Sequence, residues 1–384
     1  MSSQVEKDIL IEQFKAGLED IPAAVSDICF VDGINSLLVY RGYDVTELAA
    51  KATFEEVAYL LWFGKLPNKR EYEWFTRQLI QERELPAHVL AIVTMFPGKA
   101  NPMAALRTAI SAMSMYDPDS SDQSSDAIMR KAIRLTARIP TMIGVLERLR
   151  TGQQPLASRP DLGHAANYLY MLTGREPEEM QNRAMDLSLI LQADHELNAS
   201  TFAARVTVST LSDIYAGVVS AIGTLAGPLH GGANEQVMRM LIEIDKLENT
   251  ESYIKGLFAQ KKRVMGFGHR VYKGADPRAL VLKKWSQMLG EGYCNSKWWA
   301  MSEAIEEVVI KEKGIYPNVD FYNASVLYCL GIPLDMFTPV FASSRIVGWT
   351  AHIMEQFADN RLIRPRAIYN GPEGLEYAPI DERS

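Results

Sequence analysis

The segment that settles the fold class reads Thr53-Phe54-Glu55-Glu56-Val57-Ala58-Tyr59-Leu60-Leu61-Trp62-Phe63-Gly64. Thr53 can accept a hydrogen bond from the backbone three residues later, and Glu56 can reach back to the N–H of Thr53, which is a typical helix start. Apolar residues follow at helical spacing, and Gly64 is suited to end the helix. The same start signal returns in Asn68-Lys69-Arg70-Glu71. We therefore expect two consecutive helices.

Helical patterns also dominate the rest of the chain. An alternating pattern, typical of strands, is confined to Ile28–Tyr40, where Asp32-Gly33 predicts a turn. The sequence thus predicts a mostly α-helical protein with a small N-terminal β element. The further helices are expected at about 101–115, 127–150, 178–198, 202–226, 234–247, 276–290, 298–313, 320–329 and 338–358.

The charge balance limits the classes of partner. The 384 residues include 40 Lys and Arg and 47 Asp and Glu, which gives a net charge of −7. Nucleic acids and anionic membranes attract basic surfaces, so neither is expected as a partner. A small anionic substrate remains possible, provided that arginines gather locally around it.

The cysteines and the N-terminus indicate the compartment. Three scattered cysteines are too few for a disulfide framework or a zinc site, and they favour a reducing environment. The first residues are polar and acidic and lack the apolar core of a signal peptide. The longest uncharged run lies between Asp213 and Glu235, and its glycines and Pro228 make it a poor membrane span. We expect a cytoplasmic protein that binds no metal.

His230 stands at a break between two predicted helices, in Ala226-Gly227-Pro228-Leu229-His230-Gly231-Gly232-Ala233-Asn234-Glu235. The Gly231-Gly232 pair lets the backbone approach a ligand closely. We expect Asn234 to cap the next helix. A helix N-terminus disfavours the charged imidazolium, so His230 is expected to be neutral.

His269 follows a basic, glycine-containing loop that reads Lys261-Lys262-Arg263-Val264-Met265-Gly266-Phe267-Gly268-His269. Backbone N–H groups together with Lys and Arg make a phosphate-binding environment. The loop is not a dinucleotide-binding motif, because the third glycine and the surrounding βαβ unit are missing. A solvated basic loop is the alternative interpretation.

Four histidines have less informative surroundings. His195 lies in Asp194-His195-Glu196-Leu197-Asn198, which lacks the spacing of a zinc-binding H-E-x-x-H helix. From local sequence alone, His88, His164 and His352 are also expected to be structural.

Arginines and one aspartate complete the candidate chemistry. Arg278, Arg345 and Arg364 are guanidinium groups that could hold a di- or tricarboxylate, although a single arginine is more often a surface ion-pair partner. Asp320 precedes an apolar helix and is either its N-cap or a carboxylate in an apolar wall, where desolvation would make it a stronger base.

Small residues recur every four positions in 212–226, at Ser212, Ala216, Ser220 and Thr224. Such a face lets another helix approach closely. It would suit either a twofold subunit interface or close packing within one subunit, and the sequence leaves both open.

Taken together, these motifs resemble the citrate synthase family. Tyr40-Arg41-Gly42 and the helix at Phe54 also resemble its N-terminal region, so the resemblance covers nearly the whole chain. The motifs that carry it, in their order along the chain, are Gly227-Pro228-Leu229-His230-Gly231-Gly232-Ala233-Asn234, Met265-Gly266-Phe267-Gly268-His269-Arg270-Val271-Tyr272, Asp276-Pro277-Arg278, Asn318-Val319-Asp320-Phe321 and Arg364-Pro365-Arg366.

The resemblance implies a two-domain helical fold with a cleft that closes on substrate. Residues 1–223 and 329–384 would form the large domain and C-terminal arm, and residues 224–328 the small domain. It implies a homodimer, possibly assembled further, in which Arg364 reaches the partner's site. The implied catalytic residues are His230, His269 and Asp320. The implied ligands of oxaloacetate are His195, Arg278, Arg345 and Arg364, and those of coenzyme A are Lys261, Lys262, Arg263, Val264, Met265, Gly266 and Phe267.

By this resemblance, Asp320 takes a proton from the methyl group of acetyl-CoA while His230 stabilises the enol(ate). His269 polarises the carbonyl of oxaloacetate, and hydrolysis of citryl-CoA then gives citrate and CoA without a cofactor. Two alternatives stay open. One is 2-methylcitrate synthase, which uses propionyl-CoA, and the other is a helical CoA-binding or assembly protein that has lost catalysis.

Overall fold

The computed structural model describes Ile9 and residues 11–383 and divides into two compact units. One is formed by Ser26–Leu362 and contains the core. The described parts of the two terminal segments, Met1–Val25 and Ile363–Ser384, form the other. The described residues of the terminal unit include two short 3₁₀ helices, η1 (Ala16–Leu18) and η4 (Ile380–Glu382).

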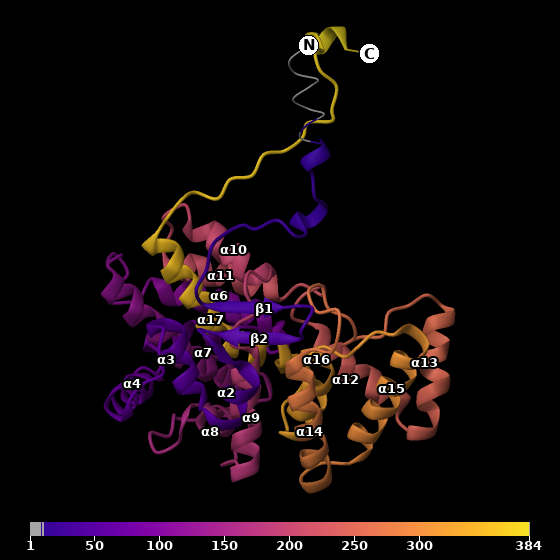
Figure 1. Cartoon of the computed structure of the whole chain (residues 1–384). Helices are drawn as coiled ribbons and strands as arrows, with labels where there is room; N and C mark the ends of the chain where they lie inside the picture. The colour runs from indigo at the N-terminus through magenta and orange to yellow at the C-terminus, as the bar shows by residue number, and fades with distance from the viewer. Residues whose placement is uncertain (1–8, 10, 384) are drawn as a thin grey trace. The chain divides into compact units, whose positions relative to one another are not determined.

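The β element is a three-stranded antiparallel sheet in the order β1-β2-β3. Figure 1 shows β1 and β2 side by side, and Cys29 of β1 lies opposite Tyr40 of β2. The carboxylate of Asp32 accepts hydrogen bonds from the backbone N–H groups of Ile34 and Asn35, each at 2.9 Å, which shapes the predicted turn. The strands are β1 (Cys29–Asp32), β2 (Leu37–Tyr40) and β3 (Tyr43–Asp44).

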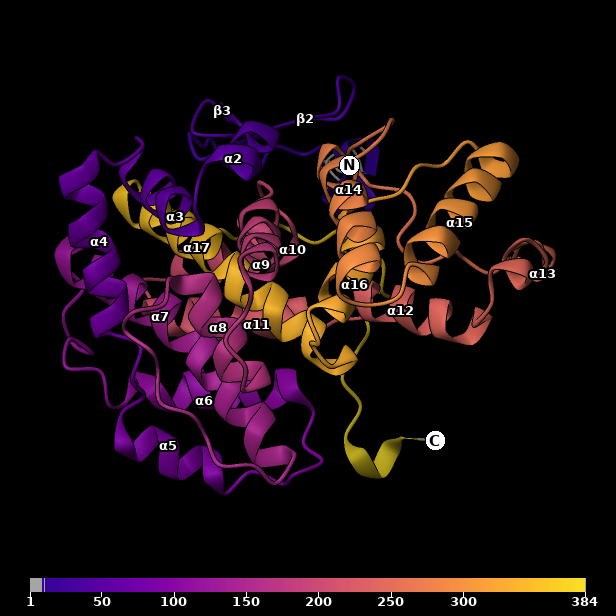
Figure 2. The same ribbon diagram turned by 90° about the horizontal axis from the view of Figure 1, so that it is seen from below.

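Several helices of this unit pack against α17, which crosses the middle of the unit in Figure 2. The residues of α17 are buried along almost its whole length. Both predicted capping boxes are confirmed, at Thr53 and at Asn68. The helices are α2 (Val45–Lys51), α3 (Phe54–Phe63), α4 (Lys69–Gln81), α5 (Ala87–Thr94), α6 (Pro102–Ser114), α7 (Ser125–Arg150), α8 (His164–Thr173), α9 (Glu179–Gln192), α10 (Ala199–Val208), α11 (Ile214–Leu225) and α17 (Phe337–Ala358), with the 3₁₀ helix η3 (Leu334–Met336) before α17.

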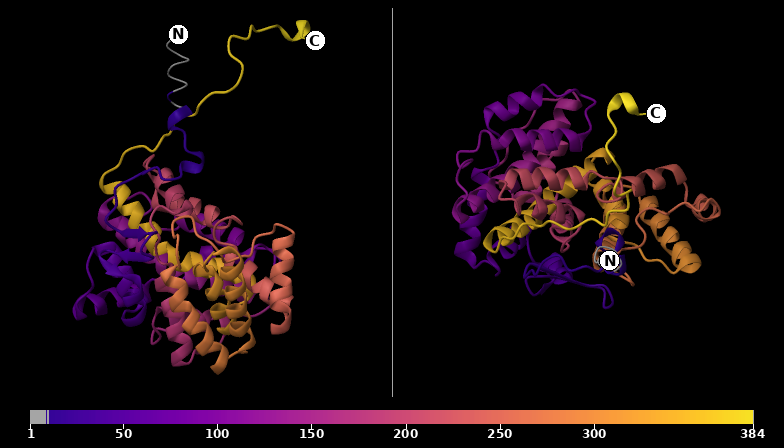
Figure 3. Two further views of the ribbon diagram at one scale, coloured as in Figure 1. Left: turned by 45° about the vertical axis from the view of Figure 1, so that its right-hand side comes forward. Right: turned by 90° about the horizontal axis from the view of Figure 1, so that it is seen from above.

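The remaining helices gather on one side of the unit, in salmon and orange in Figures 2 and 3. His269 lies in the loop between α13 and α14, and Asp320 lies at the start of α16. The proposed boundaries of a small domain at 224–328, and its closure, stay predictions. These helices are α12 (Ala233–Ile244), α13 (Thr250–Ala259), α14 (Pro277–Gly292), α15 (Lys297–Lys313) and α16 (Val319–Cys329), with the 3₁₀ helix η2 (Leu247–Asn249) between α12 and α13.

Some helix boundaries differ from the sequence prediction. The predicted helix at 202–226 is two helices, because Leu211 has a positive φ of 67° and Asp213 caps α11. The expected capping of α12 by Asn234 is wrong. Gly232 occupies the N-cap position, and Asn234 lies inside the first turn, where its side-chain oxygen accepts the N–H of Glu235.

Further helices were not expected from the patterns, namely α2, α8 and α13. They are all short, of 7 to 10 residues, so few apolar positions mark them in the sequence. No helix among the described residues is long and apolar enough to cross a membrane.

Candidate active site

Asp320 lies in the first turn of α16, and its backbone explains why the helix begins there. Asn318 is the N-cap, and its side-chain oxygen accepts the N–H of Asp320 at 3.0 Å. Interpreting Asp320 itself as the N-cap is therefore wrong. Since Asn318 performs the capping, the carboxylate of Asp320 is left for another role.

The loop before His269 is paired with the segment before Asp320. The N–H of Asn318 donates to the carbonyl of Gly266 at 2.9 Å, and the N–H of Gly268 donates to Tyr316 at 2.9 Å. The side-chain amide of Asn318 donates to the carbonyl of Gly268, also at 2.9 Å. These bonds fix the loop of His269 beside the start of α16.

Gly266 permits this close approach. Its φ is +80°, and a Cβ placed there would lie 2.7 Å from Val237 and 2.9 Å from Phe321. A larger residue would force the loop away from α16.

The ring of His269 is oriented by the main chain. Its Nδ1 lies 3.0 Å from the N–H of Val271 and 3.2 Å from that of Tyr272. Backbone N–H groups only donate, so Nδ1 accepts and the proton of the neutral ring lies on Nε2. Burial, together with a smaller effect of the charge of Arg278, lowers the pKa of His269 to about 4. His269 is therefore a neutral hydrogen-bond donor near pH 7.

His230 lies in the turn between α11 and α12, and its Nε2 faces the start of α10. Nε2 lies 2.8 Å from the hydroxyl of Ser200 and accepts the N–H of Ser200 at 3.3 Å. The indole N–H of Trp349 donates to the same hydroxyl at 3.0 Å. Because Nε2 accepts, the proton of His230 lies on Nδ1.

His230 is neutral, as expected, but for a different reason. Burial, together with a smaller effect of the positive charge of Arg345, lowers its pKa to about 4. The helix N-terminus invoked from the sequence is not the main cause.

Arg278 is almost completely buried at the start of α14 and is paired with Asp276. The carboxylate accepts the Nε of Arg278 at 3.0 Å and its Nη2 at 2.8 Å. It also accepts the backbone N–H of Val319 at 3.0 Å, which joins the start of α14 to that of α16. Burial alone would lower the pKa of Arg278, but the Asp276 ion pair outweighs it and raises the pKa.

Arg345 is buried in the middle of α17. Its Nε donates to the carbonyl of Gln192 at 2.7 Å, and its guanidinium lies 4.8 Å from the centre of the Phe341 ring. Burial lowers the pKa of Arg345, and the carboxylate of Asp194 opposes that shift. Within the described part of the chain, the bond to Gln192 is the hydrogen bond that the Arg345 guanidinium makes, so its terminal N–H groups can face an anion.

His195 follows α9 and belongs to the same cluster. Its Nε2 lies 3.3 Å from the hydroxyl of Tyr272, and its ring centre lies 5.0 Å from that of His269. Burial lowers the pKa of His195 well below its usual value, and the charge of Arg278 adds to the effect.

Asp320 is the acidic group of the cluster. Burial raises its pKa to about 7, although the charge of Arg278 opposes that rise. Its Oδ1 is buried and has no hydrogen-bond partner within the described part of the chain. A carboxylate with so high a pKa and an unpaired oxygen can accept a proton from a substrate.

The two arginines connect these groups. The positive charge of Arg278 lowers the pKa values of His195, His269 and Asp320. The positive charge of Arg345 lowers the pKa values of His195, His230 and Asp320. A cavity of about 270 Å³ opens beside His269 and is lined by Tyr272, Lys273 and Tyr316, among others. Six of the predicted residues thus share one region around a concentrated positive charge.

The remaining predicted residues have other settings. Lys261, Lys262 and Arg263 are exposed at the start of the loop, whereas Val264 and Gly266 are buried and Met265 and Phe267 half-buried. Arg364 is exposed and belongs to the terminal unit, so the contacts described above do not include it. The roles that the resemblance implies for all of these residues stay predictions.

Sequence reasoning missed several residues that support the cluster. Asp276 and Asn318 were quoted only as parts of motifs, although they hold α14, α16 and the His269 loop together. Ser200 and Tyr272 contact His230 and His195. Ser200 lies thirty positions from its partner, and no local pattern marks it.

The sequence predicted that the protein binds no metal. Within the described residues, no group of three or more His, Cys, Asp or Glu side chains is arranged to hold a metal ion.

Comparisons with known proteins show which family the chain resembles. A family model described as citrate synthase, C-terminal domain, matches residues 17–366. Citrate synthase 2 of Bacillus subtilis is 50% identical over 369 residues, which are 96% of this chain and 99% of that protein. 2-Methylcitrate synthase 1 of Corynebacterium glutamicum is 41% identical, covering 97% of this chain and 99% of that protein.

A solved structure of the Thermoplasma acidophilum citrate synthase, in a ternary complex with carboxymethyl coenzyme A and oxaloacetate, superimposes with a TM-score of 0.91. It is 34% identical in sequence, and the match covers 96% of this chain and 99% of that one.

Proposed function

Because the chain belongs to the citrate synthase family, we propose that it condenses acetyl-CoA with oxaloacetate and hydrolyses citryl-CoA to citrate and CoA. Its relatives identify it as an enzyme of the acyltransferase type, as the sequence predicted. The observation that carries the proposal is the grouping of a high-pKa carboxylate, neutral imidazoles and two buried guanidinium groups.

Asp320 is the proposed base. The methyl group of a thioester is a very weak acid, so its deprotonation needs a base whose pKa lies near the working pH. The pKa of about 7 and the unpaired Oδ1 support this assignment.

The two neutral histidines are the proposed donors to oxygen. His230 carries its proton on Nδ1 and can donate it in a hydrogen bond to the enol(ate) oxygen of acetyl-CoA as negative charge develops there. His269 carries its proton on Nε2 and can polarise the carbonyl of oxaloacetate. The new carbon–carbon bond then joins the enol(ate) carbon to that carbonyl carbon.

The substrate dianion is proposed to bind between His195, Arg278 and Arg345. These three side chains are buried, so their attraction for a carboxylate is screened little by water. We propose a homodimer in which Arg364 of one subunit completes the oxaloacetate site of the other, by analogy with the family.

Coenzyme A is proposed to lie along Arg263–Phe267, with Lys261 and Lys262 near its phosphates. Two observations support this proposal. Both lysines are exposed, and backbone hydrogen bonds hold the loop beside the start of α16, so the lysines could reach phosphates while the thioester lies near Asp320. Water then cleaves the citryl thioester. Acid–base and charge effects suffice for each of these steps, so we propose that no metal, flavin or nicotinamide takes part. We also propose that the reaction occurs in the cytoplasm.

2-Methylcitrate synthase is the second candidate, which the 41% identity to an enzyme of that name supports. It differs in using propionyl-CoA. One extra methylene in an apolar pocket changes the binding free energy by only about 1–3 kcal/mol, so activity with both thioesters is expected.

The test is release of the CoA thiol when the protein is mixed with oxaloacetate and either acetyl-CoA or propionyl-CoA. A higher kcat/KM for acetyl-CoA supports the proposal, and a higher value for propionyl-CoA assigns the chain to the second candidate. A folded sample that releases no CoA with either thioester would instead favour a catalytically inactive CoA-binding or assembly protein.

A further inference from the structure

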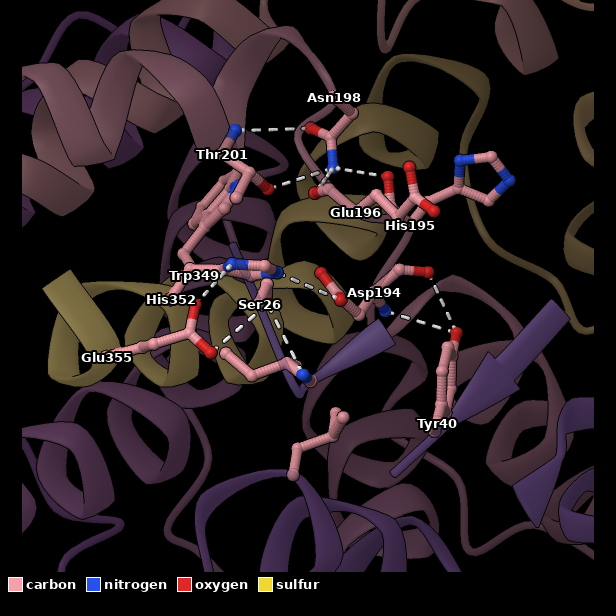
Figure 4. Close-up of polar contacts among 12 residues, drawn as sticks. Ser26, Tyr40, Asp194, His195, Glu196, Asn198, Thr201, Trp349, His352 and Glu355 are labelled. Atoms are coloured by element: carbon pink, nitrogen blue, oxygen red, sulfur yellow. Dashed lines mark hydrogen bonds and ion pairs between the residues drawn. The ribbon is translucent and has the colours of Figure 1, made fainter. Parts of the chain in front are cut away.

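A row of buried polar side chains lies behind His195. It runs from Arg205 on α10 to His352 on α17 and on to Asp194, and all three are at most 4% exposed. Nη1 of Arg205 lies 3.2 Å from Nδ1 of His352, and Nε2 of His352 lies 3.1 Å from Oδ2 of Asp194. Figure 4 shows His352 facing Asp194, while the ring of His195 points away from that carboxylate.

The donors and acceptors of this row have a defined order. A guanidinium group only donates, so Nδ1 of His352 accepts from Arg205. The ring proton therefore lies on Nε2 and is donated to Asp194. The direction is Arg205 to His352 to Asp194.

The outer end of the row is anchored. Glu355 accepts from Arg205 at 2.6 Å and from the backbone N–H of Asp27 at 3.0 Å, and Gln356 accepts the Nε of Arg205 at 3.0 Å. The guanidinium group therefore cannot turn without breaking several hydrogen bonds.

The inner end reaches the backbone of His195. The hydroxyl of Tyr40 accepts the N–H of Asp194 at 3.1 Å and donates to the carbonyl of the same residue at 2.9 Å. The carbonyl of Ala193 accepts the N–H of Gly348 at 3.1 Å, and a Cβ at Gly348 would lie 2.5 Å from Oδ1 of Asp194. The residue before His195 is thus held on several sides.

His352 supplies the hydrogen bond to the Asp194 side chain. Oδ1 of Asp194 has no hydrogen-bond partner within the described part of the chain, so the bond at Oδ2 is the one on which this buried carboxylate depends. A buried carboxylate that loses its donor becomes costly in free energy and tends to reorient. Reorientation would move the adjoining peptide of His195 and the negative charge that acts on Arg345.

We propose that His352 is a positioning residue for the substrate dianion, acting through Asp194 on His195 and Arg345. This inference rests on the proposed function, since it takes oxaloacetate as the ligand of those two residues. His352 itself lies fully buried behind them and is not expected to touch the substrate.

The test compares two replacements of similar size. In His352→Gln the terminal amide can occupy the place of Nε2 and keep a donor for Asp194. In His352→Asn the shorter amide can face Arg205 but does not reach Asp194. We expect His352→Asn to raise the Kd of oxaloacetate about tenfold, measured by titration calorimetry, with His352→Gln near wild type. The KM for acetyl-CoA should change less than twofold in both variants.

His164→Asn is the matched control. His164 is also a buried helical histidine, but its Nε2 has no hydrogen-bond partner in the described residues. The His164→Asn variant should have a lower melting temperature than the wild type and the same Kd for oxaloacetate. Asp194→Ala removes the other partner and should weaken oxaloacetate binding to a similar degree, with no further loss in the double variant with His352→Asn.

The outcomes separate the two claims. If the wild-type protein does not bind oxaloacetate, the proposed function fails and this inference fails with it. If the wild type binds oxaloacetate and Asp194→Ala or His352→Asn binds it equally well, the inference alone is overturned. Equal losses in His352→Gln and His352→Asn would also overturn it, because the loss would then not follow the donor.

Discussion

Asp320 illustrates how position sets the chemistry of a single residue. Its carboxylate is buried in the first turn of α16, and its pKa is raised to about 7 by that burial. The nearby Arg278 and Arg345 moderate the rise without cancelling it. The side chain is therefore poised to exchange a proton near neutral pH.

Asp320→Asn should lower kcat by at least about 100-fold, since an amide cannot take the proton from the thioester. Oxaloacetate binding should stay largely intact, because the guanidinium groups remain. Steady-state kinetics and oxaloacetate titration check both parts. Near-normal turnover would remove Asp320 from the mechanism.

The same replacement should stabilise the protein at alkaline pH. An Asp whose folded-state pKa exceeds its unfolded value near 3.9 binds more protons when folded, so its burial costs stability as pH rises from about 4 to 7. Asp320→Asn should therefore gain on the order of 4 kcal/mol over wild type above pH 8, and almost nothing at pH 4. Denaturant unfolding at both pH values measures the difference, and a gain that does not depend on pH would contradict it.

Single residues were predictable from the sequence only in part. The motifs directed attention to Asp320 and His269, but they did not reveal that Asn318 performs the capping. They also gave no indication of Ser200, because its contact with His230 depends on how α10 packs against a distant turn. Such contacts are created by tertiary packing and leave no local pattern.

At the scale of elements, the start of α16 and the loop before His269 behave as one piece. Asn318 contributes three hydrogen bonds to it, as cap, as backbone donor and as side-chain donor. The start of α14 is tied to it through Asp276. Groups on three separate segments therefore keep a fixed relation to one another.

Asn318→Ala and Asn318→Ser separate these contributions. Ser can still cap α16 but is too short to reach Gly268, whereas Ala can do neither. Asn318→Ser should lose about 1 kcal/mol of stability and Asn318→Ala about 2 kcal/mol. Both should lower kcat, since both lose the side-chain hydrogen bond to Gly268 that helps to hold the His269 loop. If a variant loses the expected unfolding free energy but keeps the wild-type kcat, the hydrogen bond from Asn318 to Gly268 does not matter for the reaction.

Elements whose ends are marked by capping or turn residues in the sequence were predicted well. The capping boxes before α3 and α4 and the turn at Asp32 are confirmed because their hydrogen bonds are local. The break between α10 and α11 was missed, since Leu211 gives no warning of its positive φ. The cap of α12 was assigned wrongly because Asn234 is buried and bonds to its own neighbour.

At the scale of the whole molecule, charge is distributed unevenly. The chain is acidic overall, with a net charge of −7, yet two buried arginines lie together beside the candidate catalytic groups. The family and the mostly helical fold predicted from the sequence are confirmed. The two-domain division and the dimer rest on resemblance and stay predictions.

The proposed sharing of sites can be tested by mixing subunits. Arg364→Ala should weaken oxaloacetate binding, and Asp320→Asn should be inactive. A mixture of the two chains, unfolded and refolded together, should regain part of the wild-type activity, because a heterodimer has one site with neither replacement. Each variant refolded alone is the control, and no recovery in the mixture would exclude a shared site.

The two peptide N–H groups on His269 have a consequence for how the protein tolerates mutation. Side-chain partners that fix a tautomer can be lost through one codon change, but these donors belong to the main chain at Val271 and Tyr272. Every amino acid except proline provides the same group at those positions. The tautomer of His269 is therefore maintained by nearly any residue at these two positions.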